Sequence, residues 1–257
     1  MRPDELMNVL ALDFDGVICD SAGEVLQTAL EAWSTIFPGS RLQSLMEEGP
    51  EINGAFNRLV PLGNRAEDFG VALHILENDL EIHGQEAYDR IRTTLGSRWL
   101  ERFHQEFYRA RERLRTENPE RWLGLHRTYP LFIDALRRHQ QDATYSIITA
   151  KDGGSVRRLL KHFAIDHLFP ADLILDKETG IAKTVHLEIL LDRLECNPPH
   201  ITFVDDKLNH LVTTASLGVR GVLAAWGHNT EREHRAARNR GFEVATLETA
   251  EAVVFGR

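Results

Sequence analysis

The feature that most constrains the fold is the second half of the chain, where short apolar segments alternate with amphipathic helical patterns. From Gly124 onward the pattern predicts strands at 143–149, 173–175, 200–204, 221–225 and 243–246. Helices are predicted at 130–139, 154–163, 183–194, 209–217 and 230–240. This alternation is typical of βαβ units, which form parallel sheets covered by helices. We therefore predict an α/β fold.

One further apolar run, Val9–Leu12, stands alone near the N-terminus. A single strand cannot bury both of its faces, so we expect this strand to join the later sheet. The intervening segment has helical periodicity at 21–37, 65–80, 85–95 and 97–116, whereas the periodicity fades from Gly39 to about Leu62. The predicted organisation is a Rossmann-like core of residues 1–20 and 125–257, with an all-helical cap domain inserted at 21–124.

Two helix starts carry capping signals. Ser21 is followed three residues later by Glu24, which is the spacing of a capping box. The helix near Gly154 is expected to be capped by Asp152 or by Ser155. These signals locate the helices that follow the first two strands of the expected core.

Charge and composition limit the classes of function. The net charge of -9, from 30 basic and 39 acidic residues, argues against a general nucleic-acid or anionic-membrane binder. The arginines of 97–116 are interleaved with glutamates and favour a solvated helix face over an RNA surface. Cys19 and Cys196 lack the spacing of a zinc or redox motif. The N-terminal stretch has neither a signal-peptide nor a membrane-span pattern, so we expect a cytoplasmic protein, whose oligomeric state the sequence does not indicate.

Polar residues follow three of the predicted strands. Asp13 and Asp15 end the first strand, Thr149 and Ala150 end the strand at 143–149, and Asp205 and Asp206 end the strand at 200–204. In open α/β sheets, ligands bind outside the carboxyl ends of the strands. These side chains are therefore expected to converge.

A cluster of four carboxylates requires a cation, and hard oxygen ligands suit Mg²⁺. Lys183, at the start of a helix, is expected to hold a phosphate together with the Thr149 hydroxyl and nearby amides. Lys177 competes for this role, but its position is less favourable because it does not begin a helix. A carboxylate in such a site can attack phosphorus, and a second can transfer protons.

The ordered set of motifs resembles the haloacid dehalogenase superfamily, in its phosphatase branch with a helical cap. The matching residues are Asp13-Phe14-Asp15-Gly16-Val17, Thr149 at the end of an apolar strand, Lys183, and Asp205-Asp206. The resemblance implies that Asp13 is the nucleophile, that Asp15 is the general acid and base, and that Mg²⁺ is bound by Asp13, the main-chain carbonyl of Asp15 and Asp206, with Asp205 a direct or water-mediated partner. Thr149, Ala150 and Lys183 would hold the phosphoryl group of a small phosphorylated metabolite.

Two positions depart from the family pattern. His210 stands where the family often has Asp or Asn, and Lys207 replaces a common small residue and is expected to pair with Asp205 or a nearby acid. The histidines show no metal-binding spacing, so His210 is interpreted as structural or exposed. The leading hypothesis is a phosphatase; a phosphomutase with the same site, or a catalytically silent binding protein of this fold, remain the alternatives.

Overall fold

The structure is a computed structural model that describes residues 8–42, 50–63 and 65–256. The N-terminal residues before Asn8, on which the expectation about targeting segments depends, lie outside the described part. The chain divides into two compact units, one formed by the chain up to Asp20 and from Arg127 onward, the other by Ser21–His126. The return to the first unit comes slightly later than the expected residue 125. Within the described ranges no helix combines the length and apolar character needed to cross a membrane.

The first unit contains a six-stranded parallel sheet in the order β5-β4-β1-β6-β7-β8. Its strands are β1 (Val9–Leu12), β4 (Thr144–Ile148), β5 (Ile174–Leu175), β6 (Ile201–Asp205), β7 (Arg220–Ala224) and β8 (Glu243–Ala245). β1 lies between β4 and β6, with Leu12 paired with Ile147 on one side and Val204 on the other. The predicted α/β fold with a parallel sheet is thus confirmed, including the place of the first strand in the sheet.

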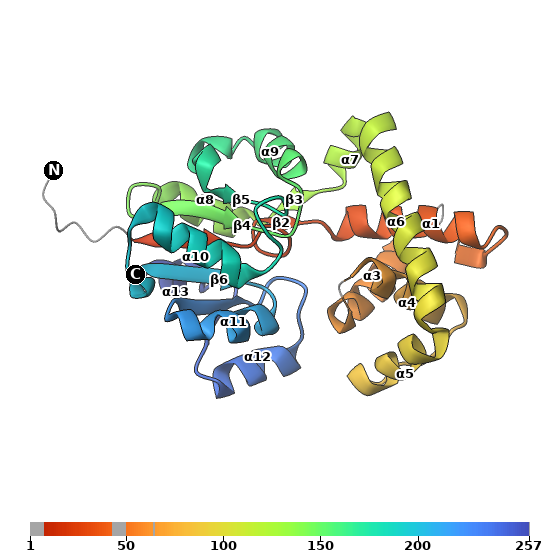
Figure 1. Ribbon diagram of the computed structural model, residues 1–257. Helices are drawn as coiled ribbons and strands as arrows, with labels where there is room; N and C mark the ends of the chain where they lie inside the picture. Colours follow the sequence, from red (N-terminus) through yellow and green to blue (C-terminus); the bar gives the residue numbers. More distant parts are fainter. Residues whose placement is uncertain (1–7, 43–49, 64, 257) are drawn as a thin grey trace, which may run out of the picture. The chain divides into compact units, whose positions relative to one another are not determined.

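Helices surround this sheet (Figure 1). They are α8 (Pro130–Arg138), α9 (Gly153–His162), α10 (Lys183–Leu194), α11 (Leu208–Thr214), α12 (Glu231–Asn239) and α13 (Ala250–Phe255). Val9 and Ala11 pack in a core cluster with Leu187 of α10 and Leu211 of α11. Because alternate strand residues face opposite sides, the equally buried Leu10 points to the other face. Both faces of β1 are therefore covered, as its continuous apolar sequence requires.

The chain leaves and re-enters this unit through a short antiparallel pair. β2 (Cys19–Asp20) pairs with β3 (Arg127–Thr128), so the two ends of the insertion are hydrogen-bonded to each other. This pair was not predicted, because strands of two residues carry no periodicity.

The second unit is helical and has its own core. Its helices are α1 (Ala22–Ile36), α3 (Pro50–Leu59), α4 (Ala66–Glu77), α5 (Gln85–Leu95), α6 (Ser97–Glu117) and α7 (Pro119–Gly124). Aromatic rings fill the space between them; Trp33, Phe69, Phe103 and Phe107 are buried. In α6 the buried residues Phe103, Phe107 and Ala110 recur every three or four positions and form one apolar face toward this core.

Helix α3 lies where the periodicity was expected to fade, so that expectation was wrong. Ile52, Phe56 and Leu59 are buried at a spacing of four and three residues, which is one helix face. Gly54, Pro50 at the start of the helix and Pro61 after its end obscure this pattern in the sequence. Residues 43–49 of the same stretch lie outside the described ranges.

The two expected helix starts turn out differently. Asp152 caps α9 by accepting a hydrogen bond from the Ser155 amide, at 2.9 Å. Ser21 precedes α1, but its side chain makes no capping hydrogen bond, so the predicted capping box is absent there. Glu24 instead accepts a hydrogen bond from the Thr28 hydroxyl, at 2.9 Å.

Glu24 also forms a buried ion pair within the helical unit. The Arg111 guanidinium of α6 donates to both carboxylate oxygens, at 2.8 and 2.7 Å, and the Glu24 side chain is fully buried. The guanidinium lies 4.6 Å from the centre of the Phe107 ring. This pair joins α1 to α6. Removing one partner of such a pair leaves a buried charge without compensation.

We therefore expect Arg111→Met to lower the free energy of unfolding by about 3 kcal/mol. Urea denaturation followed by tryptophan fluorescence measures this, since three of the four tryptophans lie in the helical unit. Adding Glu24→Gln should recover most of the loss, because no unpaired charge then remains. Arg109→Met, which removes an exposed partner of Glu106, should cost less than about 1 kcal/mol. An Arg111→Met variant as stable as the wild type would contradict this role of the pair.

Candidate active site

The carboxyl ends of two adjacent strands, β1 and β6, bring the acidic residues together. Asp13 directly follows β1, and its amide donates to the carbonyl of Val204 in β6, at 3.0 Å. Asp205 is the last residue of β6, and Asp206 follows it. Because the strands are parallel, their carboxyl ends lie at one edge of the sheet. Asp13, Asp205 and Asp206 are all buried there.

Lys183 lies between two of these carboxylates. Its Nζ is 2.7 Å from Asp13 Oδ1 and 3.5 Å from Asp205 Oδ2, and it donates to the carbonyl of Ile148 at 2.5 Å. The lysine begins α10 and is almost completely buried. Of the two lysines considered for this position, the structure therefore places Lys183 beside Asp13, whereas Lys177 is half-exposed and lies 3.9 Å from Glu178.

The two carboxylates beside Lys183 differ in their proton affinity. Burial, with the nearby charges of Asp205 and Asp206, raises the pKa of Asp13 to about 7 despite the opposing effect of Lys183. For Asp205, burial has the same tendency, but Lys183, His210 and the Lys207 amide together outweigh it and hold the pKa below its usual value. Asp205 is therefore the more readily ionised of the two carboxyls, whereas Asp13 holds its proton more strongly when no cation is present.

Asp206 is enclosed by main-chain groups. Its Oδ2 accepts a hydrogen bond from the His228 amide at 2.7 Å, and Lys207 Nζ lies 3.7 Å away. A Cβ at Gly16 would come within 2.5 Å of this carboxylate, and Gly16 has a φ of +86°. Both observations require glycine at this place in the Asp-Phe-Asp-Gly motif.

Thr149 and its neighbours lie at the carboxyl end of β4. Thr149 is buried, and its hydroxyl accepts a hydrogen bond from the Lys151 amide at 3.1 Å. Ala150 lies at the same edge, between β4 and the start of α9. The structure thus places Thr149 and Ala150 at the predicted edge of the sheet, while their contact with a phosphate stays a prediction.

Two basic residues that were not predicted as site residues, Lys151 and His210, contact its carboxylates. Lys151 Nζ lies 3.0 and 3.2 Å from the two carboxylate oxygens of Asp15. His210 Nδ1 lies 3.0 Å from both oxygens of Asp205. His210 is thus more than a structural or exposed histidine. The available signal was its position four residues after Asp206, because α11 begins at Leu208 and its first turn therefore lies next to the end of β6.

The donor set fits a hard divalent cation. Carboxylate oxygens of Asp13 and Asp205 lie close together, Asp206 is near enough to act electrostatically on Asp13, and oxygen donors are those that Mg²⁺ prefers. Burial is the main cause of the raised pKa of Asp13, and the neighbouring carboxylates add to it; a bound cation would favour the ionised form of this carboxyl. His210 supplies a nitrogen near Asp13 and Asp205, and ligand atoms from these three residues lie within 4.8 Å of one another.

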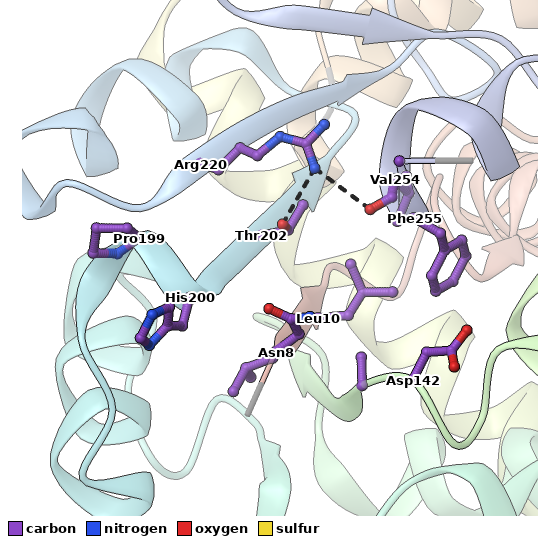
Figure 2. Close-up of a pocket in the computed structure, with 12 residues that line it drawn as sticks. Asn8, Leu10, Asp142, Pro199, His200, Thr202, Arg220, Val254 and Phe255 are labelled. Atoms are coloured by element: carbon purple, nitrogen blue, oxygen red, sulfur yellow. Dashed lines mark hydrogen bonds between the residues drawn. The ribbon is translucent and has the colours of Figure 1, made fainter. Parts of the chain in front are cut away.

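A separate cavity lies at the opposite end of the sheet. Its volume is about 460 Å³, and residues at the amino ends of the strands line it, including Val9, His200 and Arg220 (Figure 2). Arg220 points toward the cavity but is already bonded to Glu243, at 2.7 Å, and to Thr202, at 3.5 Å. This cavity therefore offers no counterpart to the acidic cluster at the carboxyl ends.

The raised pKa of Asp13 predicts how stability depends on pH in the absence of metal. Below about pH 4 the Asp13 carboxyl is protonated in both the folded and the unfolded chain. At higher pH only the folded chain keeps this proton, so the free energy of unfolding falls as the pH rises toward 7. Asp13→Asn removes this titration, so the stability of the variant relative to the wild type should increase between about pH 5 and pH 8. Thermal unfolding with a chelator present measures it. A relative stability that does not change with pH would contradict the assignment.

Comparisons with known proteins identify the family of the chain and support its fold. A family model described as haloacid dehalogenase-like hydrolase matches residues 7–218. No curated protein matches the chain significantly. Among solved structures, a predicted phosphoglycolate phosphatase from Haemophilus somnus has 17% identity and a TM-score of 0.63, covering 98% of this chain and 99% of that one.

Two further structures resemble the chain. A haloacid dehalogenase-like family hydrolase from Streptococcus pneumoniae has 14% identity and a TM-score of 0.62, over 98% of this chain and 99% of that one. A predicted phosphatase from Clostridium acetobutylicum has 12% identity and a TM-score of 0.60, over 98% and 100%. At these identities the structures support the fold. The family model, which covers most of the chain, shows that the protein belongs to the haloacid dehalogenase-like hydrolases.

Proposed function

We propose that the protein is a Mg²⁺-dependent phosphatase that hydrolyses a small phosphate monoester through a covalent aspartyl-phosphate on Asp13. The observation that carries this proposal is the placement of the Asp13 carboxylate 2.7 Å from the buried Lys183 ammonium, at the carboxyl edge of the sheet. An anionic oxygen next to a fixed cation can approach a phosphate that would otherwise repel it. Family membership and the phosphatases among the similar structures support the same reaction class.

The proposed reaction has two displacement steps. In the first, an Asp13 oxygen forms a bond to phosphorus while the bond to the ester oxygen breaks, and Asp15 donates a proton to that leaving oxygen. In the second, Asp15 removes a proton from water, whose oxygen attacks phosphorus and releases Asp13 and inorganic phosphate. The resemblance to the phosphatase branch of the family, which includes an acid at the position of Asp15, favours phosphoryl transfer.

The metal would be held by Asp13, the main-chain carbonyl of Asp15 and Asp206. When bound, Mg²⁺ supplies positive charge that screens the carboxylates and binds phosphate oxygens. Asp205 is already engaged by Lys183, His210 and the Lys207 amide. Asp206 is also engaged, by the His228 amide and Lys207 Nζ, but it has fewer such contacts than Asp205. We therefore favour Asp206 as the direct ligand, with Asp205 as a supporting partner.

The phosphoryl group would be bound by Thr149, the amide of Ala150 and Lys183. Thr149 is held in place because its amide donates to the carbonyl of Leu175, at 2.9 Å. The start of α9 directly follows these residues, and amides at a helix start favour anions. We further propose that the helical unit acts as a cap that excludes water during the reaction.

The direct test is release of inorganic phosphate from a panel of small phosphate esters with Mg²⁺. Asp13→Asn keeps the shape of the side chain but removes the nucleophile, so turnover should fall on the order of a thousandfold or more. Asp192→Asn, an exposed carboxylate of α10, is the matched control and should keep wild-type turnover. A chelator should abolish activity, and added Mg²⁺ should restore it.

Several outcomes would contradict the proposal. Equal turnover by wild type and Asp13→Asn would remove Asp13 as the nucleophile. If the wild type releases phosphate from none of the esters, phosphatase action on small phosphate esters is excluded. Transfer of the phosphoryl group to another position of the substrate, without release, would identify a phosphomutase.

A further inference from the structure

Asp15 is the most exposed of the four site carboxylates, and one lysine engages both of its oxygens. The Asp15 side chain is 34% exposed, whereas that of Lys151 is only 12% exposed. The ammonium lies 3.0 Å from Oδ1 and 3.2 Å from Oδ2. A contact with both oxygens restricts rotation of the carboxylate about its terminal bond, which is otherwise a soft torsion.

The backbone of Lys151 is itself fixed on both sides. Its amide donates to the Thr149 hydroxyl at 3.1 Å, and its carbonyl accepts a hydrogen bond from the Lys177 amide at 3.2 Å. These bonds tie the lysine to the end of β4 and to the segment after β5. The loop that carries Asp15 is also tight, because the Gly16 amide donates to the carbonyl of Cys19 at 2.8 Å. The ion pair thus joins two anchored segments.

We propose that Lys151 is a positioning residue for Asp15, which it orients for proton transfer to the leaving oxygen. This inference rests on the proposed function, because it assigns a partner to the acid of that reaction. Lys183 is committed to Asp13 and Asp205, at 2.7 and 3.5 Å, so the two lysines serve different carboxylates. Lys183 acts on the nucleophile side of the phosphate, and Lys151 acts on the leaving-group side through Asp15.

Substrates whose leaving groups differ in basicity distinguish a positioning role of Lys151 from a general structural role. An alkyl phosphate expels a strongly basic oxygen that needs a proton, whereas p-nitrophenyl phosphate expels a stable phenolate that needs little help. Loss of orientation at Asp15 should therefore slow the alkyl ester selectively. A purely structural defect would slow both substrates alike.

The experiment compares Lys151→Met, Lys151→Arg and Asp15→Asn on an alkyl phosphate and on p-nitrophenyl phosphate. For Lys151→Met, kcat on the alkyl ester should fall about tenfold to a hundredfold with KM nearly unchanged, and kcat on p-nitrophenyl phosphate should fall less than about threefold. Lys151→Arg should recover part of the loss, because it restores a cation. The double variant with Asp15→Asn should be no slower than Asp15→Asn alone, since both changes affect one step.

Lys161→Met is the matched control, since this lysine is exposed on the last turn of α9. Equal losses on both substrates, a raised KM with unchanged kcat, or additive effects in the double variant would each overturn the proposal. A raised KM would instead assign Lys151 to binding of the substrate.

A crystal structure of Lys151→Met provides a test that does not depend on turnover. The proposal expects the Asp15 carboxylate to adopt a different orientation, or several, while Asp13 and Lys183 keep their contact. An Asp15 side chain unchanged in this variant would overturn the proposal. If the wild type hydrolyses neither ester, the proposed function fails, and the crystal structure still decides whether Lys151 orients Asp15.

Discussion

The structure depends on the balance of charge at the carboxyl edge of the sheet. Three buried carboxylates and the more exposed carboxylate of Asp15 would repel one another strongly if no positive charge compensated them. Lys183, Lys151 and His210 each contact a different carboxylate or pair of carboxylates, which distributes the compensation over the site. The topology makes this possible, because β1 lies between β4 and β6 and all three strands end at the same edge.

This compensation of charge is incomplete at Asp13. Lys183 and its neighbours keep Asp205 ionised, while burial leaves Asp13 with a pKa near neutrality in the absence of a cation. Buried groups of this kind reduce stability, and they persist at sites where their chemistry is used. In the proposed reaction the same residue is the nucleophile. The helical unit has a separate core and its own buried pair, Glu24 and Arg111.

Much of the core was predictable because its strands are local features of the sequence. Each of the six strands is a short apolar run next to turn or helix signals, and Asp13, Lys183, Asp205 and Asp206 stand at the strand and helix ends where ligands are expected. Helix α3 was missed because Gly54 and flanking prolines weaken its pattern. The capping box at Ser21 was wrong because Glu24 is used in a tertiary ion pair with Arg111, which local spacing cannot reveal. The same reason explains Lys151: its partner, Asp15, is 136 residues away in the sequence.

The central claim is that Asp13 becomes covalently phosphorylated, and chemical trapping tests it most directly. Borohydride reduces an acyl phosphate to an alcohol, so a phosphorylated aspartate becomes homoserine. Protein quenched during turnover with Mg²⁺, reduced and digested should contain homoserine at position 13, and omission of the substrate should abolish the modification. Rapid turnover with no modified residue, or homoserine at a different aspartate, would contradict the account.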